Sequence, residues 1–464
     1  MKLQFKNELG KIIIISVFLN VTCIFSVNAA DVSSAVKNKT EGVVFAEKVK
    51  NSLNSGSKEE TLALFETMPE SLKNSPDMLV LQASVLLSAG KIAEASDLVE
   101  KLKSVAPDAR ETAELSLLTA KLSKNRAKYA EVLAQLAQSK NGKDLANIEY
   151  AEDFLRKNKY DKATEYFLTA YQANPANPDS LIGLGKCNYY QGKFDQAKKN
   201  FSTILAKDEY NSQANLYMGK ILAEENKNRS ALEYARKALK SDPENYDIYI
   251  DIGSYSHQLM DYKGAEEAWT KAISIVPDFF LTYAYRASLY DEMNLFDKAY
   301  EDYKKVIQLN PKYYYAFESL GMLAWHEQDY AGSCNAFMKA LEMNPDNYSY
   351  MLMVAAGLIK DGKQQQAKTF LAGALKKFDR ESLEYSVIRI YHDGGGRNAE
   401  NLTMLKLSKE QNSTKRKKLT YYMGLFYEIN NFQERAQELY GQVLTGAPIF
   451  FEYRLAEWSV KDGQ

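Results

Sequence analysis

The sequence predicts an all-α fold, a right-handed α-solenoid of stacked antiparallel helix pairs with units of 34 residues. Three series of residues keep this step along the chain. Prolines mark the ends of successive units: Pro243, Pro277, Pro311 and Pro345. A small residue, usually alanine, forms the second series: Ala163, Ala197, Ala231, Ala265, Ala299, Ser333 and Ala367. A residue four positions later, usually large, forms the third: Phe167, Phe201, Ala235, Trp269, Tyr303, Phe337 and Leu371. A fixed period of this length is typical of helical repeat proteins.

Residues 294–311, which read NLFDKAYEDYKKVIQLNP, contain one amphipathic helix and its end. Ala299, Tyr303 and Val306 recur at helical spacing and should line one face. Asn310 precedes Pro311, and a proline disfavours helical geometry in the residue before it. The helix is therefore expected to end at this Asn-Pro pair.

Small residues in the first helix of each unit should let the second helix approach closely. They are Gly185, Gly219, Gly253, Ala287, Gly321 and Ala355. Large residues of the second helix, such as Trp269 and Phe337, should then fill the space between units. A single unit cannot bury its apolar face, so neighbouring units must stack.

Repeat regularity divides the chain into six segments. They are a signal peptide (1–29), a polar leader (30–41), degenerate amino-terminal units (42–143), a core array of seven units (144–381), a degenerate unit or insertion (382–416) and a final unit with a capping helix (417–464). In the fifth segment, HDGGGRNAE at 392–400 indicates a loosened turn, and one extra residue shifts the frame. We expect the last helix, Phe451 to Val460, to cover the exposed end of the stack, as terminal repeats must.

The amino terminus has the pattern of a secretory signal peptide. Lys2, Lys6 and Lys11 form a positive end, residues 12–25 form an apolar core, and small residues at 27–29 form a cleavage site. The mature chain is therefore expected to be exported and periplasmic or envelope-associated, without a membrane span. The apolar run is shorter than the ~20 residues that a spanning helix needs.

Two alternatives for the amino terminus stay open. The apolar run could be retained as an anchor, and Cys23 could carry a lipid after cleavage just before it. A bacterial lipobox usually has leucine three positions before the cysteine and a small residue directly before it. Asn20 and Thr22 stand in those places here. A secreted protein is a further alternative.

Composition and motifs argue against an enzyme or a nucleic-acid-binding protein. Lysine and arginine number 59 and aspartate and glutamate 60, so no strong positive field exists to attract nucleic acid. The histidines 257, 326 and 392 fall in different repeats without metal-ligand spacing, and no phosphate-binding or catalytic motif is found. The glycine run at 394–396 is typical of an inter-helix turn, and the basic run at 415–418 of solvated surface. We expect no catalytic residue, metal or cofactor.

The repeat resembles the tetratricopeptide repeat (TPR) over residues 42–450. The residues that carry the resemblance in one unit are Leu320, Gly321, Ser333, Phe337, Ala340 and Pro345. Asn188 departs from the pattern where an aromatic residue is usual, and Glu209 where proline is usual. The tail from Tyr421 to Trp458 is also similar to the end of the NlpI-type periplasmic TPR lipoproteins.

This resemblance implies a concave groove lined by the first helices of the units. The groove positions that it implies are Lys186, Tyr189, Tyr190, Lys220, His257, Tyr285, Tyr315, Trp325 and His326. Tyrosine, tryptophan and lysine suit binding of an extended peptide or a partner helix. The predicted function is a non-enzymatic protein-interaction scaffold of the cell envelope, with assembly, secretion or cell-wall factors as partners. The alternative is a structural subunit that self-associates or joins an envelope or secretion complex.

Overall fold

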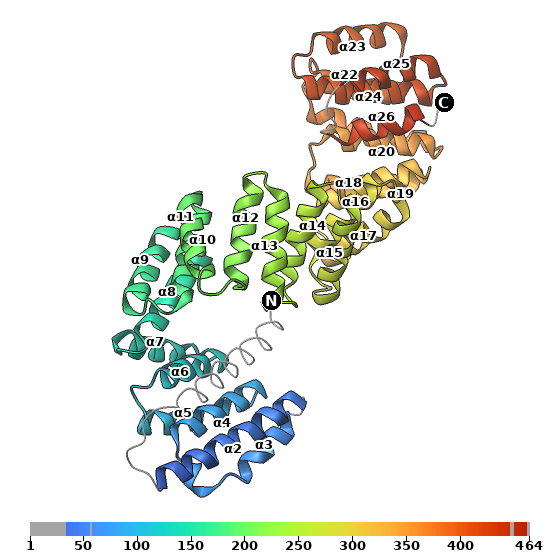
Figure 1. Cartoon of the computed structure of the whole chain (residues 1–464). Helices are drawn as coiled ribbons and strands as arrows, with labels where there is room; N and C mark the ends of the chain where they lie inside the picture. Colours follow the sequence, from blue (N-terminus) through green and yellow to red (C-terminus); the bar gives the residue numbers. More distant parts are fainter. Residues whose placement is uncertain (1–33, 56–57, 446–449, 462–464) are drawn as a thin grey trace. The chain divides into compact units, whose positions relative to one another are not determined.

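The structure, a computed structural model, describes residues 34–55, 58–445 and 450–461, and within these ranges it contains helices and no strand (Figure 1). The predicted signal peptide, with Cys23, lies outside the described residues. The chain divides into two compact units, Met1–Ile221 and Leu222–Gln464. Within each unit, antiparallel helix pairs stack in chain order, so the predicted all-α architecture is confirmed. No helix in the described part of the chain is long and apolar enough to cross a membrane.

The amino-terminal unit begins with an irregular helix pair and continues with regular ones. Its elements are α2 (Ser34–Ser55), α3 (Lys58–Glu66), a 3-10 turn (Glu70–Leu72), α4 (Pro76–Ser88), α5 (Ile92–Val105), α6 (Arg110–Leu122), α7 (Arg126–Gln138), α8 (Lys143–Arg156), α9 (Tyr160–Ala173), α10 (Pro178–Tyr190), α11 (Phe194–Leu205) and α12 (Ser212–Glu224), of which residues up to Ile221 belong to this unit. Residues 34–41 of the predicted polar leader form the first turns of α2.

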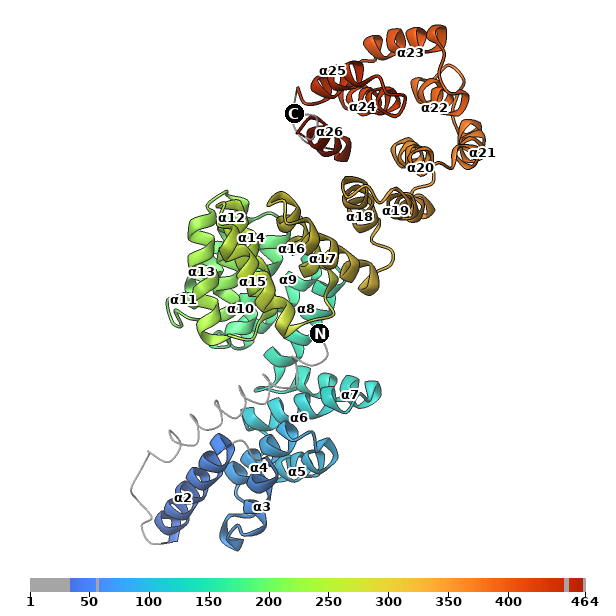
Figure 2. The ribbon, with the colours of Figure 1, turned by 90° about the vertical axis from the view of Figure 1, so that its right-hand side faces the viewer.

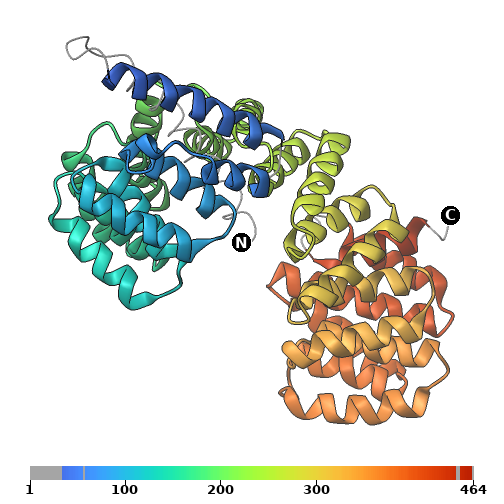
Figure 3. The same cartoon turned by 90° about the horizontal axis from the view of Figure 1, so that it is seen from below.

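The carboxy-terminal unit continues the same alternation, and its successive helix pairs lie in parallel rows (Figure 3). Its elements are α13 (Asn228–Ser241), α14 (Tyr246–Gln258), α15 (Tyr262–Ile275), α16 (Phe280–Glu292), α17 (Phe296–Leu309), α18 (Tyr314–His326), α19 (Tyr330–Met343), α20 (Tyr348–Lys360), α21 (Gln364–Ala374), a 3-10 turn (Leu375–Lys377), α22 (Leu383–Asp393), α23 (Arg397–Lys409), α24 (Ser413–Ile429), α25 (Gln433–Val443) and α26 (Phe451–Lys461). From α4 to α25, even numbers are first helices of a pair and odd numbers are second helices.

The first and second helices of a pair approach closely at the glycine positions that the sequence indicated. A Cβ atom added to Gly321 would lie 2.7 Å from the ring of Phe337, which is fully buried. A Cβ atom on Gly253 would lie 2.3 Å from Nε1 of Trp269. Real Cβ atoms do not make such short contacts, so the rings occupy the space that a side chain would need.

In the nine helix pairs from α4–α5 to α20–α21, the turn inside the pair contains one residue in the left-handed region, and these residues follow at steps of 34. They are Gly90, Lys124, Asn158, Gly192, Asn226, Met260, Asn294, Gln328 and Gly362, with φ between 55° and 78°. The corresponding residue of the last pair is Asn431, one position later than two further periods would place it. One extra residue relative to the 34-residue step therefore lies between Gly362 and Asn431. The glycines at 394–396 form the turn between α22 and α23.

Met260 offers a test of this turn, because its side chain is 79% exposed and contributes no core packing. A left-handed backbone costs an L-residue about 1–2 kcal/mol, of which glycine avoids the greater part. We expect Met260→Gly to raise the free energy of unfolding by about 0.5–1 kcal/mol in urea unfolding followed by circular dichroism. Gly192→Ala, at the same place in another turn, should lower it by about 1 kcal/mol. A lower free energy of unfolding for Met260→Gly would contradict a left-handed backbone at this turn position.

Candidate functional site

The predicted groove residues of the amino-terminal unit lie in a cluster of aromatic rings around the end of α10. Tyr190 is 49% exposed and stacks on Tyr160 at a centroid distance of 5.5 Å and an interplanar angle of 12°. Tyr189 packs edge-on against Tyr190 and Tyr217, at 5.3 and 5.5 Å. The Nζ atom of Lys186 lies 5.6 Å from the ring centre of Tyr217, a cation–π contact. The structure therefore brings three of the predicted residues together.

Polar contacts fix this cluster. The hydroxyl oxygens of Tyr190 and Tyr217 lie 3.2 Å apart, at hydrogen-bond distance. Burial raises the pKa of Tyr217, and the hydrogen bond with Tyr190 raises it further, so the Tyr217 hydroxyl stays neutral. Lys220, the fourth predicted residue of this unit, is half-buried in α12. The exposed face of Tyr190 beside a lysine suits a peptide that carries apolar and anionic groups.

In the carboxy-terminal unit, the rings of His257 and Tyr285 both lie near Trp269. The indole of Trp269 is 6.1 Å from the ring of His257 and 5.9 Å from that of Tyr285. Glu292 lies 2.7 Å from His257 Nε2 and accepts a hydrogen bond of 2.6 Å from the Tyr262 hydroxyl. Burial raises the pKa of the Glu292 carboxyl, but these two hydrogen bonds outweigh it and lower the pKa. His257 is therefore held by a structural contact, whereas Tyr285 is 41% exposed.

The other three predicted residues of this unit differ in accessibility. Tyr315 is 52% exposed at the start of α18. Trp325, at the other end of α18, is half-buried against the core and packs edge-on against Tyr330 at 5.1 Å. His326 lies against Trp458 of α26 at a centroid distance of 4.5 Å. Part of the predicted surface is thus already covered by the chain itself.

Helix α26 lies on the first helices of the carboxy-terminal unit, between α24 and α18 (Figure 2). Trp458 is buried against His326 and Phe296, whose ring is 5.3 Å away. Arg454 donates hydrogen bonds to the Asp291 carbonyl, at 3.2 Å, and to Asn294 Oδ1, at 2.6 Å. Helix α26 therefore contacts residues more than 150 positions earlier as well as its neighbours α24 and α25.

The start of α26 buries a carboxylate. Glu452 is fully buried, and it accepts hydrogen bonds from the hydroxyls of Ser349 and Tyr422, the latter at 3.2 Å. The Nζ atom of Lys418 is 3.7 Å from the second carboxylate oxygen. Burial raises the pKa of Glu452, and the nearby Lys418 and the hydrogen bonds only partly oppose this rise.

Sequence reasoning missed this arrangement. The prediction that the basic run at 415–418 is solvated surface is wrong for two of its members. Lys418 faces Glu452, and Lys415 forms ion pairs with Glu384 at 2.8 Å and Glu410 at 3.4 Å. A signal was available: α26 carries Phe451, Glu452, Arg454 and Trp458, which a helix that only caps a stack would not need.

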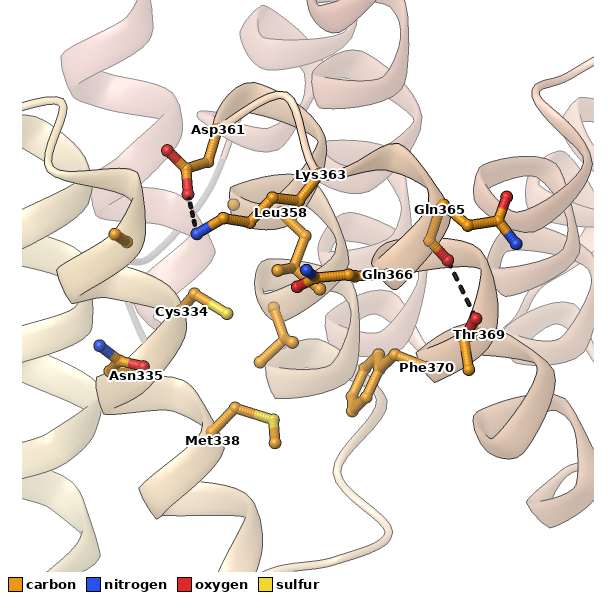
Figure 4. A pocket seen from close by; sticks show the side chains of 13 residues that line it. Cys334, Asn335, Met338, Leu358, Asp361, Lys363, Gln365, Gln366, Thr369 and Phe370 are labelled. Carbon is orange, nitrogen blue, oxygen red and sulfur yellow. Dashed lines mark hydrogen bonds and ion pairs between the residues drawn. The ribbon is translucent and has the colours of Figure 1, made fainter.

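A cleft of about 570 Å³ opens between the second helices α19 and α21, with α20 as its floor (Figure 4). Cys334 and Met338 line it from α19, Leu358 from α20 and Phe370 from α21. Burial raises the pKa of the Cys334 thiol, which disfavours the reactive thiolate. No three His, Cys, Asp or Glu side chains in the described ranges could hold a metal ion together. We find no arrangement here that indicates a reaction.

Comparison with protein families addresses the repeats directly. Models described as tetratricopeptide repeat match residues 154–221, 216–278, 282–313 and 314–347. These four segments carry tetratricopeptide repeats. These TPR matches include the units of Tyr190, His257, Tyr285 and Tyr315. Tetratricopeptide repeats generally serve in protein–protein interaction.

Solved structures with similar helical repeats include MamA, at 26% identity over 35% of this chain and 95% of that chain, with a TM-score of 0.34. PilF of Pseudomonas aeruginosa is 20% identical over 46% of this chain and 96% of that chain, with a TM-score of 0.37. YrrB, described as a TPR protein with an unusual peptide-binding site, is 16% identical over 40% and 95%, with a TM-score of 0.35. A comparison with curated proteins gave no match.

The buried carboxyl of Glu452 predicts that α26 docks less tightly as the pH rises. A group whose pKa is raised by docking favours the docked state below its free pKa, near 4.5, and loses this contribution as the pH passes through the docked pKa. Amide hydrogen exchange of residues 451–461, corrected for intrinsic rates, should show decreasing protection over that range. Glu452→Gln should remove the dependence and keep α26 protected.

Glu457→Gln is the matched control, because Glu457 lies on the same helix and pairs with Arg454 at 2.6 Å. This variant should keep the pH dependence of the unaltered chain. Protection that increases with pH, or a Glu452→Gln variant with an unchanged profile, would show that the carboxyl does not govern docking.

Proposed function

We propose that this chain is a non-enzymatic scaffold of the cell envelope that binds segments of other proteins on the first helices of its repeats. The observation that carries the proposal is the seat of α26. The first helices of the carboxy-terminal unit hold a helix by an aromatic stack, an arginine and a buried carboxylate. An amphipathic helix laid on such a surface is a recurring mode of protein recognition.

The aromatic cluster of the amino-terminal unit supports the same function. It combines an exposed tyrosine, Tyr190, with Lys186, and within the described residues Lys186 forms a cation–π contact but no ion pair. The rings are fixed by one another and by a hydrogen bond, so little side-chain entropy would be lost on binding. Tyrosine and tryptophan are also enriched among residues that dominate binding energy.

The envelope part of the proposal is supported by the amino-terminal sequence. Residues 1–29 combine a positive end, an apolar core and small residues at a cleavage position. Proteins of the envelope, such as assembly, secretion or cell-wall factors, are the partners that this location would supply.

Photo-cross-linking in cells tests the proposal. Benzoylphenylalanine is placed at Tyr190, Tyr285 or Tyr315, and at Tyr300 as the control, since Tyr300 is 38% exposed on the second helix α17. We expect adducts with another envelope protein at the first three positions and none at Tyr300. Equal adducts at all four positions, or none at the three, would contradict the proposal. Adducts with this chain alone would favour the self-associating alternative.

A further inference from the structure

The side chains that α26 buries have the spacing of a helix bound in a groove. Phe451, Leu455 and Trp458 stand at positions i, i+4 and i+7, and each is at most 8% exposed. Arg454, at i+3, donates a hydrogen bond to Asn294. Anchors at these intervals lie along one face of a helix, and partner helices are recognised through the same intervals. Helix α26 therefore presents the anchor pattern of a helical ligand.

The seat of α26, the surface of α18, α20 and α24 that it covers, belongs to the inner face of the repeats. In Figure 2, α26 lies on the inner side of the curve that α18, α20, α22 and α24 form. Trp458 contacts His326 of α18, a predicted groove residue, and the ring of Phe451 is 6.0 Å from that of Tyr350 in α20. A helix that only covered the last pair would contact α24 and α25 alone. Helix α26 instead occupies the surface on which a partner would bind.

The polar contacts between α26 and its seat are incomplete. Three buried atoms have no hydrogen-bond partner among the described residues: Oδ1 of Asp291, Oε2 of Glu452 and Nε1 of Trp458. Of these, only Glu452 Oε2 is near an opposite charge, Lys418 Nζ at 3.7 Å. Buried polar groups are nearly always paired, because an unpaired one loses its hydration without replacement. A helix with other side chains at these places can therefore fit the seat better than α26 does.

The seat presents carboxyl groups to its occupant. Arg454 donates to the backbone carbonyl of Asp291 and leaves Oδ1 of that residue unpaired. Glu318 of α18 accepts a hydrogen bond of 2.5 Å from the Tyr350 hydroxyl. Burial raises the pKa of Glu318, this hydrogen bond lowers it, and the nearby Glu452 raises it again. Helix α26 thus adds a carboxylate to an acidic surface, and an occupant without that carboxylate would avoid the repulsion.

We propose that the seat of α26 is a binding site for an amphipathic helix of a partner protein, with net positive charge, which replaces α26. This inference rests on the proposed function and names the partner class and the regulation of one surface. The partner helix has aromatic residues at i and i+7, a basic residue at i+3, and an uncharged or basic residue in place of Glu452.

Helix α26 acts in this scheme as an internal competitor. Residues 444–450 connect it to α25, which keeps it at high effective concentration beside its seat. A helix that binds only as well as α26 is therefore excluded. A partner that pairs Asp291 and brings no carboxylate to the place of Glu452 gains contacts that α26 lacks, so it can compete.

A second copy of this chain is a poorer occupant than a different protein. Its α26 has the same side chains, so exchange between two copies would leave Asp291 Oδ1 and Trp458 Nε1 unpaired as before. The exchange would also bring the same carboxylate of Glu452 to the same place. The unpaired atoms therefore favour a partner with a different sequence.

Fluorescence anisotropy with labelled peptides tests the inference on the full chain. The first probe has the sequence of residues 450–461, FFEYRLAEWSVK, and the second carries Glu452→Gln in that sequence. Trp458→Ala in the chain weakens docking of its own α26, so this variant should bind the first probe about thirtyfold more tightly than the unaltered chain does. The second probe should bind the variant about tenfold more tightly than the first, because no charge is buried.

Three controls accompany this measurement. Arg454→Ala in the chain, a second way to weaken α26, should also increase affinity for the first probe. Phe201→Leu truncates a fully buried ring of the amino-terminal unit and should leave probe binding as weak as in the unaltered chain. A probe that itself carries Trp458→Ala should bind none of these chains, because it lacks the anchor at i+7.

Unchanged affinity in both α26 variants with native circular dichroism, or an equal gain in Phe201→Leu, would overturn the inference. Equal binding of the two probes would overturn the assigned partner chemistry. Dimers of the unaltered chain in sedimentation that Trp458→Ala abolishes would assign the seat to a second copy instead.

The cross-linking experiment separates these failures from failure of the proposed function. Adducts at Tyr190, Tyr285 and Tyr315 without probe binding in the α26 variants would leave the scaffold standing and remove only the replacement of α26. Probe binding without adducts would remove the proposed scaffold and keep the seat as a site for a helix.

Discussion

The structure depends on the close approach of two helices within each repeat. A glycine or alanine of the first helix faces a ring of the second helix, as Gly321 faces Phe337 and Gly253 faces Trp269. The ring fills the space that a larger side chain would take, and it is buried from both sides. Because each repeat buries its apolar face only with its neighbours, this contact also sets the step from one repeat to the next.

A regular step has a consequence for function. Residues at the same position of successive units line up, so a sequence period of 34 becomes a row of side chains in space. The aromatic residues that begin α14, α16 and α18, Tyr246, Phe280 and Tyr314, recur in this way, and so does the series of left-handed turn residues. Such a surface exists before a partner arrives, which lowers the entropy cost of binding. Binding surfaces thus follow from the same periodicity that stabilises the fold.

Much of the fold could be predicted from local periodicity, but contacts distant in sequence could not. The close helix approach at Gly321 follows from residue sizes at a fixed spacing. The seat of α26 joins Arg454 to Asp291, and no period relates these positions. The partners of Lys415 and Lys418 were missed for the same reason, since their carboxylates come from other helices. Three of the predicted site residues, Tyr190, Tyr285 and Tyr315, are exposed. His326, by contrast, is covered by α26, which contacts residues far away in the sequence.

A double-mutant cycle on Gly321 and Phe337 tests the central contact most directly. Gly321→Ala should lower the free energy of unfolding by about 1–3 kcal/mol because the added Cβ meets the ring, and Phe337→Leu should lower it because a buried ring is truncated. The double variant should lose at least ~1 kcal/mol less than the sum, since the smaller side chain admits the Cβ. If the two losses add within ~0.5 kcal/mol, Gly321 and Phe337 are not coupled. That result would contradict the claim that the glycine makes room for the ring.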